Sequence, residues 1–151
     1  MSSVSVQSEP FDIAAEQDRL RAGKPRIGAL VTFVGLMRDL SDGEAVESML
    51  LEHYPAMTER ALREIVAEAE HRWDLLGVRV VHRVGELRPQ DPIVLVAVAA
   101  VHRGEAFRAC EFLIDYLKTR APFWKKERTA AGERWVDARD SDAEAEARWR
   151  S

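Results

Sequence analysis

Cysteine is almost absent from this chain of 151 residues, because Cys110 is the single one. An intrachain disulfide is therefore impossible. Cys110 lies in an apolar stripe with helical spacing, which favours packing in the core over a reactive thiol. Sulfur chemistry at any site of this protein would need sulfur brought by a partner.

Long apolar runs are also missing. The longest, IVLVAVAAV at residues 93–101, is far shorter than the roughly 20 residues that cross a bilayer, and it predicts a buried strand instead. The first residues, MSSVSVQSEPFDIAAEQ, show neither the basic start nor the apolar core of a secretory signal. We therefore expect a cytoplasmic protein that does not associate with membranes.

The motifs of several enzyme classes do not occur. No serine stands in a nucleophile-elbow sequence, the four histidines lack close metal-ligand spacing, and neither a phosphate-binding loop nor a dinucleotide fingerprint is found. We expect no metal ion and no cofactor. Nucleic-acid binding has weak support, because Phe123 and Trp124 could stack on bases but a net charge of −4 does not give a broad basic surface.

The sequence has the balance of a single globular domain, with 46% hydrophobic and 32% charged residues. Residues 1–26 are polar and punctuated by proline and glycine, so we expect a flexible leader with one short helix ending near Gly23. Residues 27–151 should form the domain.

Apolar periodicity indicates an α+β fold. Strands are expected at 27–34, 46–54, 78–84 and 93–101, a loop at 35–45, helices at about 57–73 and 104–120, a β-hairpin of 123–128 and 133–138, and a short C-terminal helix from 141. The helix at 104–120 should end at Pro122, and its expected core stripe is Phe107, Cys110, Leu113, Ile114 and Leu117.

Positive charge is concentrated in the segment YLKTRAPFWKKER. Five of the 22 Lys and Arg residues lie between Lys118 and Arg128, together with one acidic residue, Glu127. Lys118 falls in the last turn of the expected helix, where a cation also stabilises the helix end. In the following strand, period-two geometry places Lys125 and Glu127 on one face and Lys126 on the other, so the adjacent lysines should have different roles.

Three further residues are candidates for binding an anion. His102 and Arg103 follow a buried strand at the start of a helix, where free N–H groups attract negative charge. Arg38 lies on the glycine-containing loop after the first expected strand. Taken alone, each also fits a structural or solvated role. Taken together with Lys118 and Lys125, they predict a basic pocket for a small anion.

The chain resembles a known family in a series of segments. GALVTFVGLMRD, LEHYPAMTERAL, HRVGEL, VAAVHRGEAF, YLKTRAPFWKKE and GERWVDARDSD occur in the order found in the large, catalytic subunit of molybdopterin synthase. The resemblance covers about residues 27–149. It implies an α/β-hammerhead-type single domain with a C-terminal β-hairpin.

The resemblance also implies a reaction and its partners. The family converts cyclic pyranopterin monophosphate into molybdopterin, a step of molybdenum-cofactor biosynthesis. Two dithiolene sulfurs are delivered by the thiocarboxylated Gly-Gly C-terminus of a small ubiquitin-like subunit. The large subunits form a homodimer within a heterotetramer. A non-catalytic anion-binding or adaptor module on the same scaffold is the alternative function.

By motif, the resemblance gives roles to residues of this chain. Lys118 and Lys125 correspond to the catalytic lysines. The positions that correspond to substrate-binding residues are Arg38, His102, Arg103, Lys126 and Glu127. The chain departs from the family at Leu36 and Met37, where relatives often carry a lysine two residues before the loop arginine.

Overall fold

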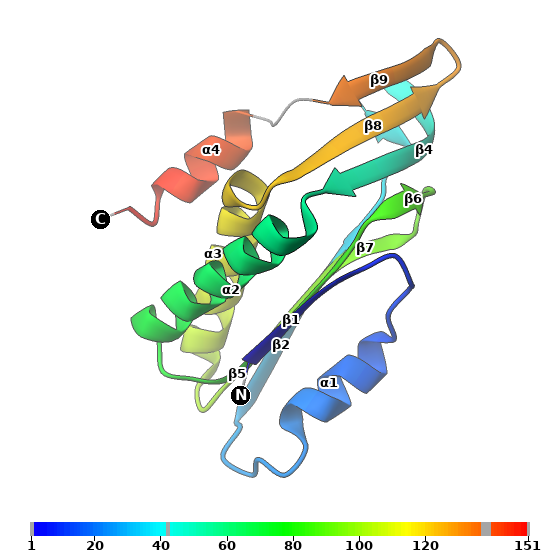
Figure 1. The fold of residues 1–151 in the computed structure, drawn as a ribbon. Coiled ribbons are helices and arrows are strands. Elements are labelled where there is room, and N and C mark those ends of the chain that lie inside the picture. Colours follow the sequence, from blue (N-terminus) through cyan, green and yellow to red (C-terminus); the bar gives the residue numbers. More distant parts are fainter. Residues whose placement is uncertain (1, 42, 137–139, 151) are drawn as a thin grey trace.

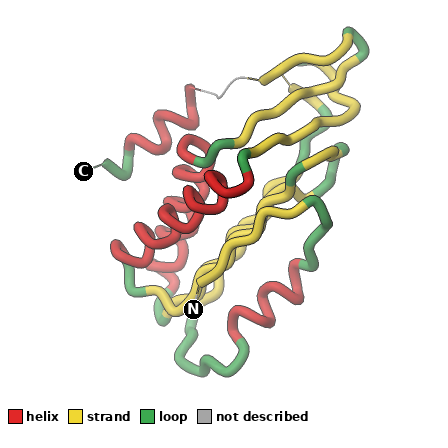
Figure 2. Tube along the Cα trace, viewed as in Figure 1, coloured by secondary structure: helices red, strands yellow, loops and turns green. Residues whose placement is uncertain are grey.

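Strands and helices follow one another along the chain largely as the apolar periodicity predicts. The computed structural model describes residues 2–41, 43–136 and 140–150. Its elements are β1 (Ser2–Gln7), α1 (Ile13–Arg21), β2 (Ala29–Leu36), β3 (Leu40–Ser41), β4 (Glu44–His53), α2 (Pro55–Arg72), β5 (Leu75–Arg83), β6 (Gly85–Leu87), β7 (Pro92–Ala100), α3 (Arg103–Arg120), β8 (Phe123–Thr129), β9 (Gly132–Val136) and α4 (Asp140–Ala147). The α+β class is confirmed (Figures 1 and 2).

A four-stranded sheet in the order β1-β5-β7-β2 forms the platform of the molecule. β1 pairs with β5 in parallel, and the other pairs are antiparallel. Helices α2 and α3 cover one face of this sheet and α1 covers the other (Figure 1). Val96 and Val98 of β7 point to the first face, whereas Leu95 and Ala97 point to the second, and all four are fully buried.

The face that helix α3 packs on the sheet differs in part from the predicted face. Cys110, Leu113 and Leu117 are buried as expected, but Phe107 is 61% exposed, so its predicted place in the core is wrong. The buried positions also include Ala106, Ala109, Phe112 and Tyr116. This repeat of three and four residues centres the buried stripe near position 113, and position 107 falls outside it.

The N-terminal segment is part of the fold, so the prediction of a flexible leader over residues 1–26 is wrong for the residues described. β1 pairs with β5 in continuous register from Ser2 opposite Val78 to Gln7 opposite Arg83. The backbone of a parallel edge strand is held by ladder hydrogen bonds that its polar composition does not reveal. The expected short helix is confirmed, because α1 ends at Arg21.

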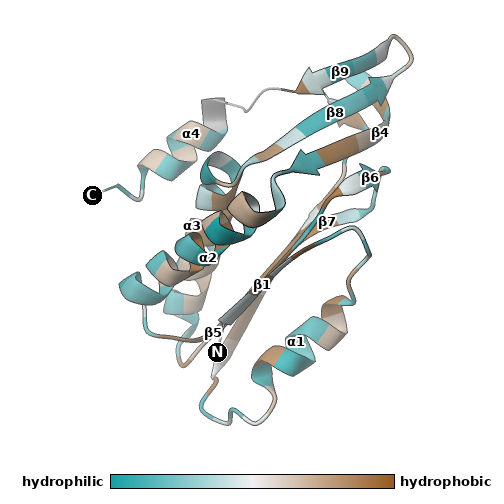
Figure 3. Cartoon of the chain, in the orientation of Figure 1, coloured by the Kyte–Doolittle hydropathy of each residue, from teal (hydrophilic) through white to brown (hydrophobic). Residues whose placement is uncertain are grey.

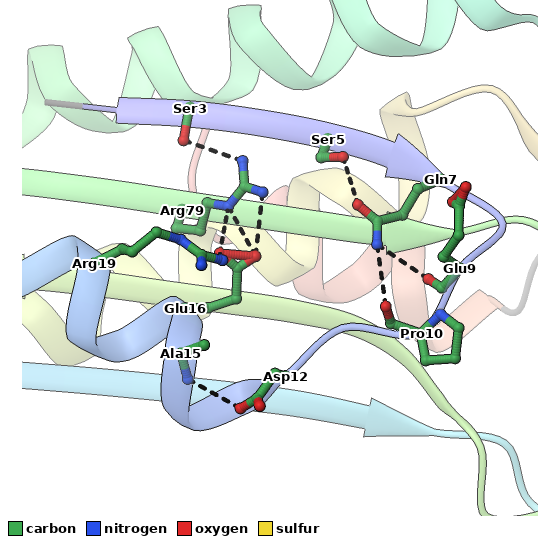
Figure 4. Close-up of polar contacts among 10 residues, drawn as sticks. All are labelled: Ser3, Ser5, Gln7, Glu9, Pro10, Asp12, Ala15, Glu16, Arg19 and Arg79. Carbon is green, nitrogen blue, oxygen red and sulfur yellow. Dashed lines mark hydrogen bonds and ion pairs between the residues drawn. The ribbon is translucent and has the colours of Figure 1, made fainter.

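Helix α1 is fixed to the sheet by a buried ion pair (Figure 4). The Glu16 carboxylate accepts hydrogen bonds from Arg79 of β5 at 3.2 Å and from Arg19 at 2.6 Å. Burial opposes ionisation of Glu16, but the two guanidinium groups outweigh it and hold the pKa of this carboxyl below its usual value. Asp12 accepts a hydrogen bond from the Ala15 N–H and so caps the helix.

A second sheet, of five strands, runs in the order β3-β4-β8-β9, with β6 paired to β4. β8 and β9 form the predicted hairpin, and they pair from Lys125 opposite Val136 to Thr129 opposite Gly132. The last two residues of the predicted second strand, 137 and 138, lie outside the described residues. β8 is mostly hydrophilic (Figure 3), unlike the central strands of the platform.

The C-terminal helix α4 is confirmed and packs against α3. Trp149, just after α4, donates its indole N–H to Asp115 at 2.7 Å, and Glu146 accepts a hydrogen bond from the Thr119 hydroxyl at 2.8 Å. Over residues 2–41, 43–136 and 140–150, no helix is both long and apolar enough to span a membrane.

Candidate active site

A cavity of about 480 Å³ lies where the platform meets the second sheet. Its apolar wall includes Phe33, Met37, Met49, Leu51, Ile93 and Val94, and its polar wall includes Arg38, His82, Lys118, Lys125, Glu127 and Asp142. A larger surface depression between α1 and the start of β2 contains none of the predicted site residues. The cavity at the junction of the sheets is therefore the candidate active site.

Lys118 and Lys125 reach this cavity from the two sides of one turn. Lys118 lies in the last turn of α3, and β8 begins at Phe123. Pro122 lacks the N–H that would continue the helix, so the chain turns there. The buried Thr58 hydroxyl of α2 donates a hydrogen bond to the Pro122 carbonyl at 3.1 Å. This contact fixes the turn between the two lysines.

The alternation of β8 separates the neighbouring lysines as predicted. Lys125 and Glu127 line the cavity. Lys126 is not among the lining residues; its ammonium group pairs with Glu133 at 3.2 Å and lies 5.4 Å from the centre of the Trp135 ring. The structure therefore brings Lys125 and Glu127 into the site and leaves Lys126 outside it.

Arg38 follows β2 on a segment held by backbone hydrogen bonds. The Met37 N–H donates to the Asp91 carbonyl at 3.0 Å, and the Met37 carbonyl accepts from the Gln90 N–H at 2.8 Å. Arg38 lines the cavity beside Leu36 and Met37. Leu36 and Met37 thus contribute apolar surface next to Arg38.

His102 and Arg103 do not reach this cavity within one copy of the chain. They stand at the start of α3, are exposed, and are not among the lining residues. Arg103 and Lys118 are separated by about 22 Å along the helix axis. The structure therefore unites Arg38, Lys118, Lys125 and Glu127, and places His102 and Arg103 at the opposite end of the helix.

His82 is a cavity residue that the sequence analysis did not select. Its ring stacks on Phe123 with a centroid distance of 3.8 Å, and its Nδ1 lies 2.8 Å from the Arg83 carbonyl oxygen. Burial, followed by the charges of Lys125, His53 and Lys118, lowers the pKa of His82 to about 4, against the effect of the backbone hydrogen bond. The imidazole is therefore neutral at pH 7.

The tautomer of His82 follows from its partner. A carbonyl oxygen only accepts hydrogen bonds, so Nδ1 carries the proton and Nε2 keeps a lone pair. The alternation of VRVVHRV indicates that His82 shares the inward face of Val78 and Val80. This was the signal that could have identified the residue.

The arrangement suits the binding of a small anion and reactions of an amine. Arg38, Lys118 and Lys125 offer positive charge within one partly apolar cavity, where charge–charge interactions are stronger than in bulk water. Lysine can also act as a base or a nucleophile when its amine is neutral. In the described part of the chain, no group of three His, Cys, Asp or Glu side chains is placed to hold a metal ion.

Comparison with known proteins identifies relatives over nearly the whole chain. The molybdopterin synthase catalytic subunit of Ralstonia nicotianae is 61% identical over 149 residues, covering 99% of this chain and 85% of the relative. The MoaE molybdopterin biosynthesis protein of Burkholderia ambifaria has a solved structure that is 58% identical and superposes with a TM-score of 0.85, covering 99% and 98% of the two chains.

A more distant structure shares the fold. It is the complex of subunits 1 and 2 of molybdopterin-converting factor from Helicobacter pylori, which is 21% identical with a TM-score of 0.72 and covers 90% of this chain and 91% of the matched chain. The family model described as MoaE protein matches residues 6–120. On this match and the identity to its relatives, the chain belongs to the MoaE family.

Proposed function

We propose that the chain is the catalytic subunit of a molybdopterin synthase. In this function it is a sulfurtransferase (EC 2.8.1.12) that converts cyclic pyranopterin monophosphate into molybdopterin. The observation that carries the proposal is the meeting of Lys118, Lys125 and Arg38 in one cavity. Relatives at this level of identity are named molybdopterin synthase catalytic subunits.

The sulfur comes from a small ubiquitin-like subunit that ends in a thiocarboxylated Gly-Gly. Each tail gives up one sulfur and returns to a carboxylate whose new oxygen comes from water, so two tails are consumed for one dithiolene. Cys110 cannot supply this sulfur, because it is buried and burial raises the pKa of its thiol to about 12. Glycine residues lack side chains and so suit entry past the apolar wall of the cavity.

The residues that line the cavity divide between two tasks. Lys118 and Lys125 are the catalytic residues, which act on the acyl carbon of the tail and on the protons of the substrate. Arg38 binds the phosphate, since a guanidinium group can donate two parallel hydrogen bonds to it. Glu127 contributes a carboxylate to the substrate-binding wall. Lys126 points away from this wall in the same copy, so its substrate contact stays a prediction.

His102 and Arg103 enter the proposal through a second copy of the chain. Both are exposed and lie about 22 Å along α3 from the cavity of their own copy. A homodimer within a heterotetramer lets them complete the anion site of the neighbour, as interfaces between copies often do. Sedimentation should show a dimer, and a fully active monomer would contradict this part of the proposal.

Reconstitution tests the function directly. The purified chain is incubated with cyclic pyranopterin monophosphate and a thiocarboxylated small subunit, and dithiolene product is measured. Deleting the two terminal glycines of the small subunit should leave most of its binding affinity and remove sulfur transfer. A chain that binds the precursor without forming dithiolene would favour the alternative, a non-catalytic anion-binding module. The cytoplasmic location expected from the sequence stays a prediction.

A further inference from the structure

Arg134 lies just behind the cavity and contacts three of the elements that surround it. It stands directly opposite Glu127 in the register of the β8–β9 hairpin. Its Nε and Nη2 atoms lie 3.3 and 3.2 Å from one carboxylate oxygen of Glu127. Its Nη1 donates to Glu44 at 2.9 Å, and its Nη2 donates to the Ser41 carbonyl at 3.1 Å. The guanidinium group is therefore held by β3, β4 and β8 together.

This arrangement fixes the Glu127 carboxylate in the cavity wall. The Glu127 side chain is only 9% exposed, and a carboxylate so deeply buried is costly unless it is paired. Both contacts from Arg134 go to the same oxygen, Oε1, so the group is anchored through one side. Arg134 itself is absent from the cavity wall, whereas Glu127 lines it.

Without Arg134, the carboxylate would face a strong competing attraction. Lys125 lies two residues from Glu127 on the same face of β8, and Lys118 and Arg38 line the same cavity. A carboxylate released from the hairpin would turn toward these cations and weaken their hold on an anion. The ion pair with Arg134 keeps the negative charge at the hairpin side.

The charge of Glu127 also determines which part of a ligand it can meet. A carboxylate repels phosphate but accepts hydrogen bonds from N–H groups, and a pterin ring presents such groups. Cations on one side and a fixed carboxylate on the other therefore match a ligand that has an anionic group and a donor-bearing heterocycle.

We infer that Arg134 is a positioning residue, which holds Glu127 so that its carboxylate receives N–H donors of the substrate's pterin ring. The identity of that ligand rests on the proposed function. Arg134 acts only through Glu127, so the two residues should behave as one unit when they are changed.

A double-mutant cycle tests this inference in the full-length chain. The variants are E127Q, R134Q and the double variant E127Q/R134Q, with R134K as a second change at the same position. R128Q is the matched control, because Arg128 is an arginine of the same hairpin that stands next to Glu127 on β8, is 62% exposed and pairs with Glu133 at 3.7 Å. Dissociation constants are measured by fluorescence for a pterin without phosphate, and separately for inorganic phosphate by competition.

We expect E127Q and R134Q each to weaken pterin binding on the order of tenfold, as loss of an orienting partner does in other sites. The double variant should bind no more weakly than either single one. R134K should fall between the wild type and R134Q, because an ammonium keeps the charge but loses the forked geometry. Phosphate binding should change little in all of these variants, and R128Q should match the wild type.

Three results would overturn the inference. They are multiplied losses in the double variant, no measurable binding of the pterin to the wild type, and an equal weakening of phosphate and pterin binding in R134Q, which would indicate a general structural role for Arg134. The outcome is separate from that of the proposed function, which depends on dithiolene formation in the reconstituted system. Coupled pterin binding without turnover would sustain the inference and refute the proposed function.

Discussion

The two sheets of this molecule are held together by different forces. In the platform, β5 and β7 are mostly buried, β7 is apolar throughout, and α2 and α3 add a continuous core. In the second sheet, the β8–β9 hairpin is crossed by ion pairs such as Lys126–Glu133 and Arg134–Glu127. One proposed catalytic lysine, Lys118, comes from α3, which packs on the platform, and the other, Lys125, comes from β8 of the second sheet. The site therefore depends on the apolar core of the platform and on the ion-paired hairpin.

The largest expected effect breaks the site and leaves both sheets intact. Lys118→Ala should lower sulfur transfer at saturating substrate by about a hundredfold or more, because it removes an amine from the reacting groups. Its cost to folding should be at most about 1 kcal/mol, since it is a cation at a helix end. Single-turnover assays and urea unfolding measure the two effects.

Lys118→Arg separates charge from chemistry. Guanidinium keeps its proton and serves neither as base nor as nucleophile, so this variant should remain as slow as Lys118→Ala. Near-normal turnover would show that only the positive charge of Lys118 is needed.

The next effect breaks the platform instead. Phe112 of α3 is fully buried and packs against the rings of Trp73 and Trp149, so Phe112→Ala should lower the unfolding free energy by about 3 to 5 kcal/mol. Phe107→Ala is the control on the same helix, because Phe107 is 61% exposed and its truncation should change little. Equal losses for the two variants in urea unfolding would refute the observed core.

A pH experiment examines the junction of the two sheets through His82. The unfolded chain protonates this imidazole below pH 6.5, whereas the folded protein keeps it neutral down to about pH 4. Stability is therefore lost as pH falls through this window, by about 3 kcal/mol in full. His82→Gln removes this linkage, so its unfolding free energy should decrease less than that of the wild type between pH 7 and pH 4.

The control for this experiment is His71→Gln, since His71 is exposed on α2. It should follow the wild-type pH dependence in urea unfolding. If His82→Gln also followed it, the imidazole would not be buried in its neutral form.

The smallest expected effect concerns the face of the platform that α1 covers, where the ion pair between Glu16 and Arg79 anchors this helix. Glu16→Gln should lower the unfolding free energy by about 2 kcal/mol, because Arg79 loses its charged partner in a buried place. Asp18→Asn is the control, since its partner Arg21 is exposed and such pairs contribute little. Both variants are measured by calorimetry. Equal losses of unfolding free energy would show that the buried ion pair contributes no more to stability than the exposed one.

Most of the platform and hairpin could be predicted from the sequence because their periodicity is local. Alternation in β8 alone separated Lys125 from Lys126, and the stop at Pro122 placed Lys118 at a helix end. The pairing of β1 with β5 could not be predicted, since it joins Ser2 to Val78 across a long stretch of chain and leaves no local pattern. Phe107 was misplaced because Ala106, the residue before it, takes the buried position in that turn of α3.

The part of the site that could be predicted is the part that local sequence reveals. Arg38, Lys118 and Lys125 were selected by residue type and motif, and the fold brings them together. His82 and Arg134 were missed, because the value of each depends on a partner in another strand: Phe123 for one and Glu127 for the other. The separation of His102 and Arg103 from the cavity likewise follows from the length of α3, which a motif does not show.

The parallel pairing of β1 has a practical consequence for protein engineering. Ser2 pairs with Val78, four residues before His82 along β5, so Ser2 lies about 13 Å along the strand from the cavity end of the platform (Figure 1). An affinity tag or fluorescent fusion added before Ser2 therefore emerges away from the cavity. Trimming the first seven residues would instead strip an edge strand from the sheet and uncover the backbone of β5.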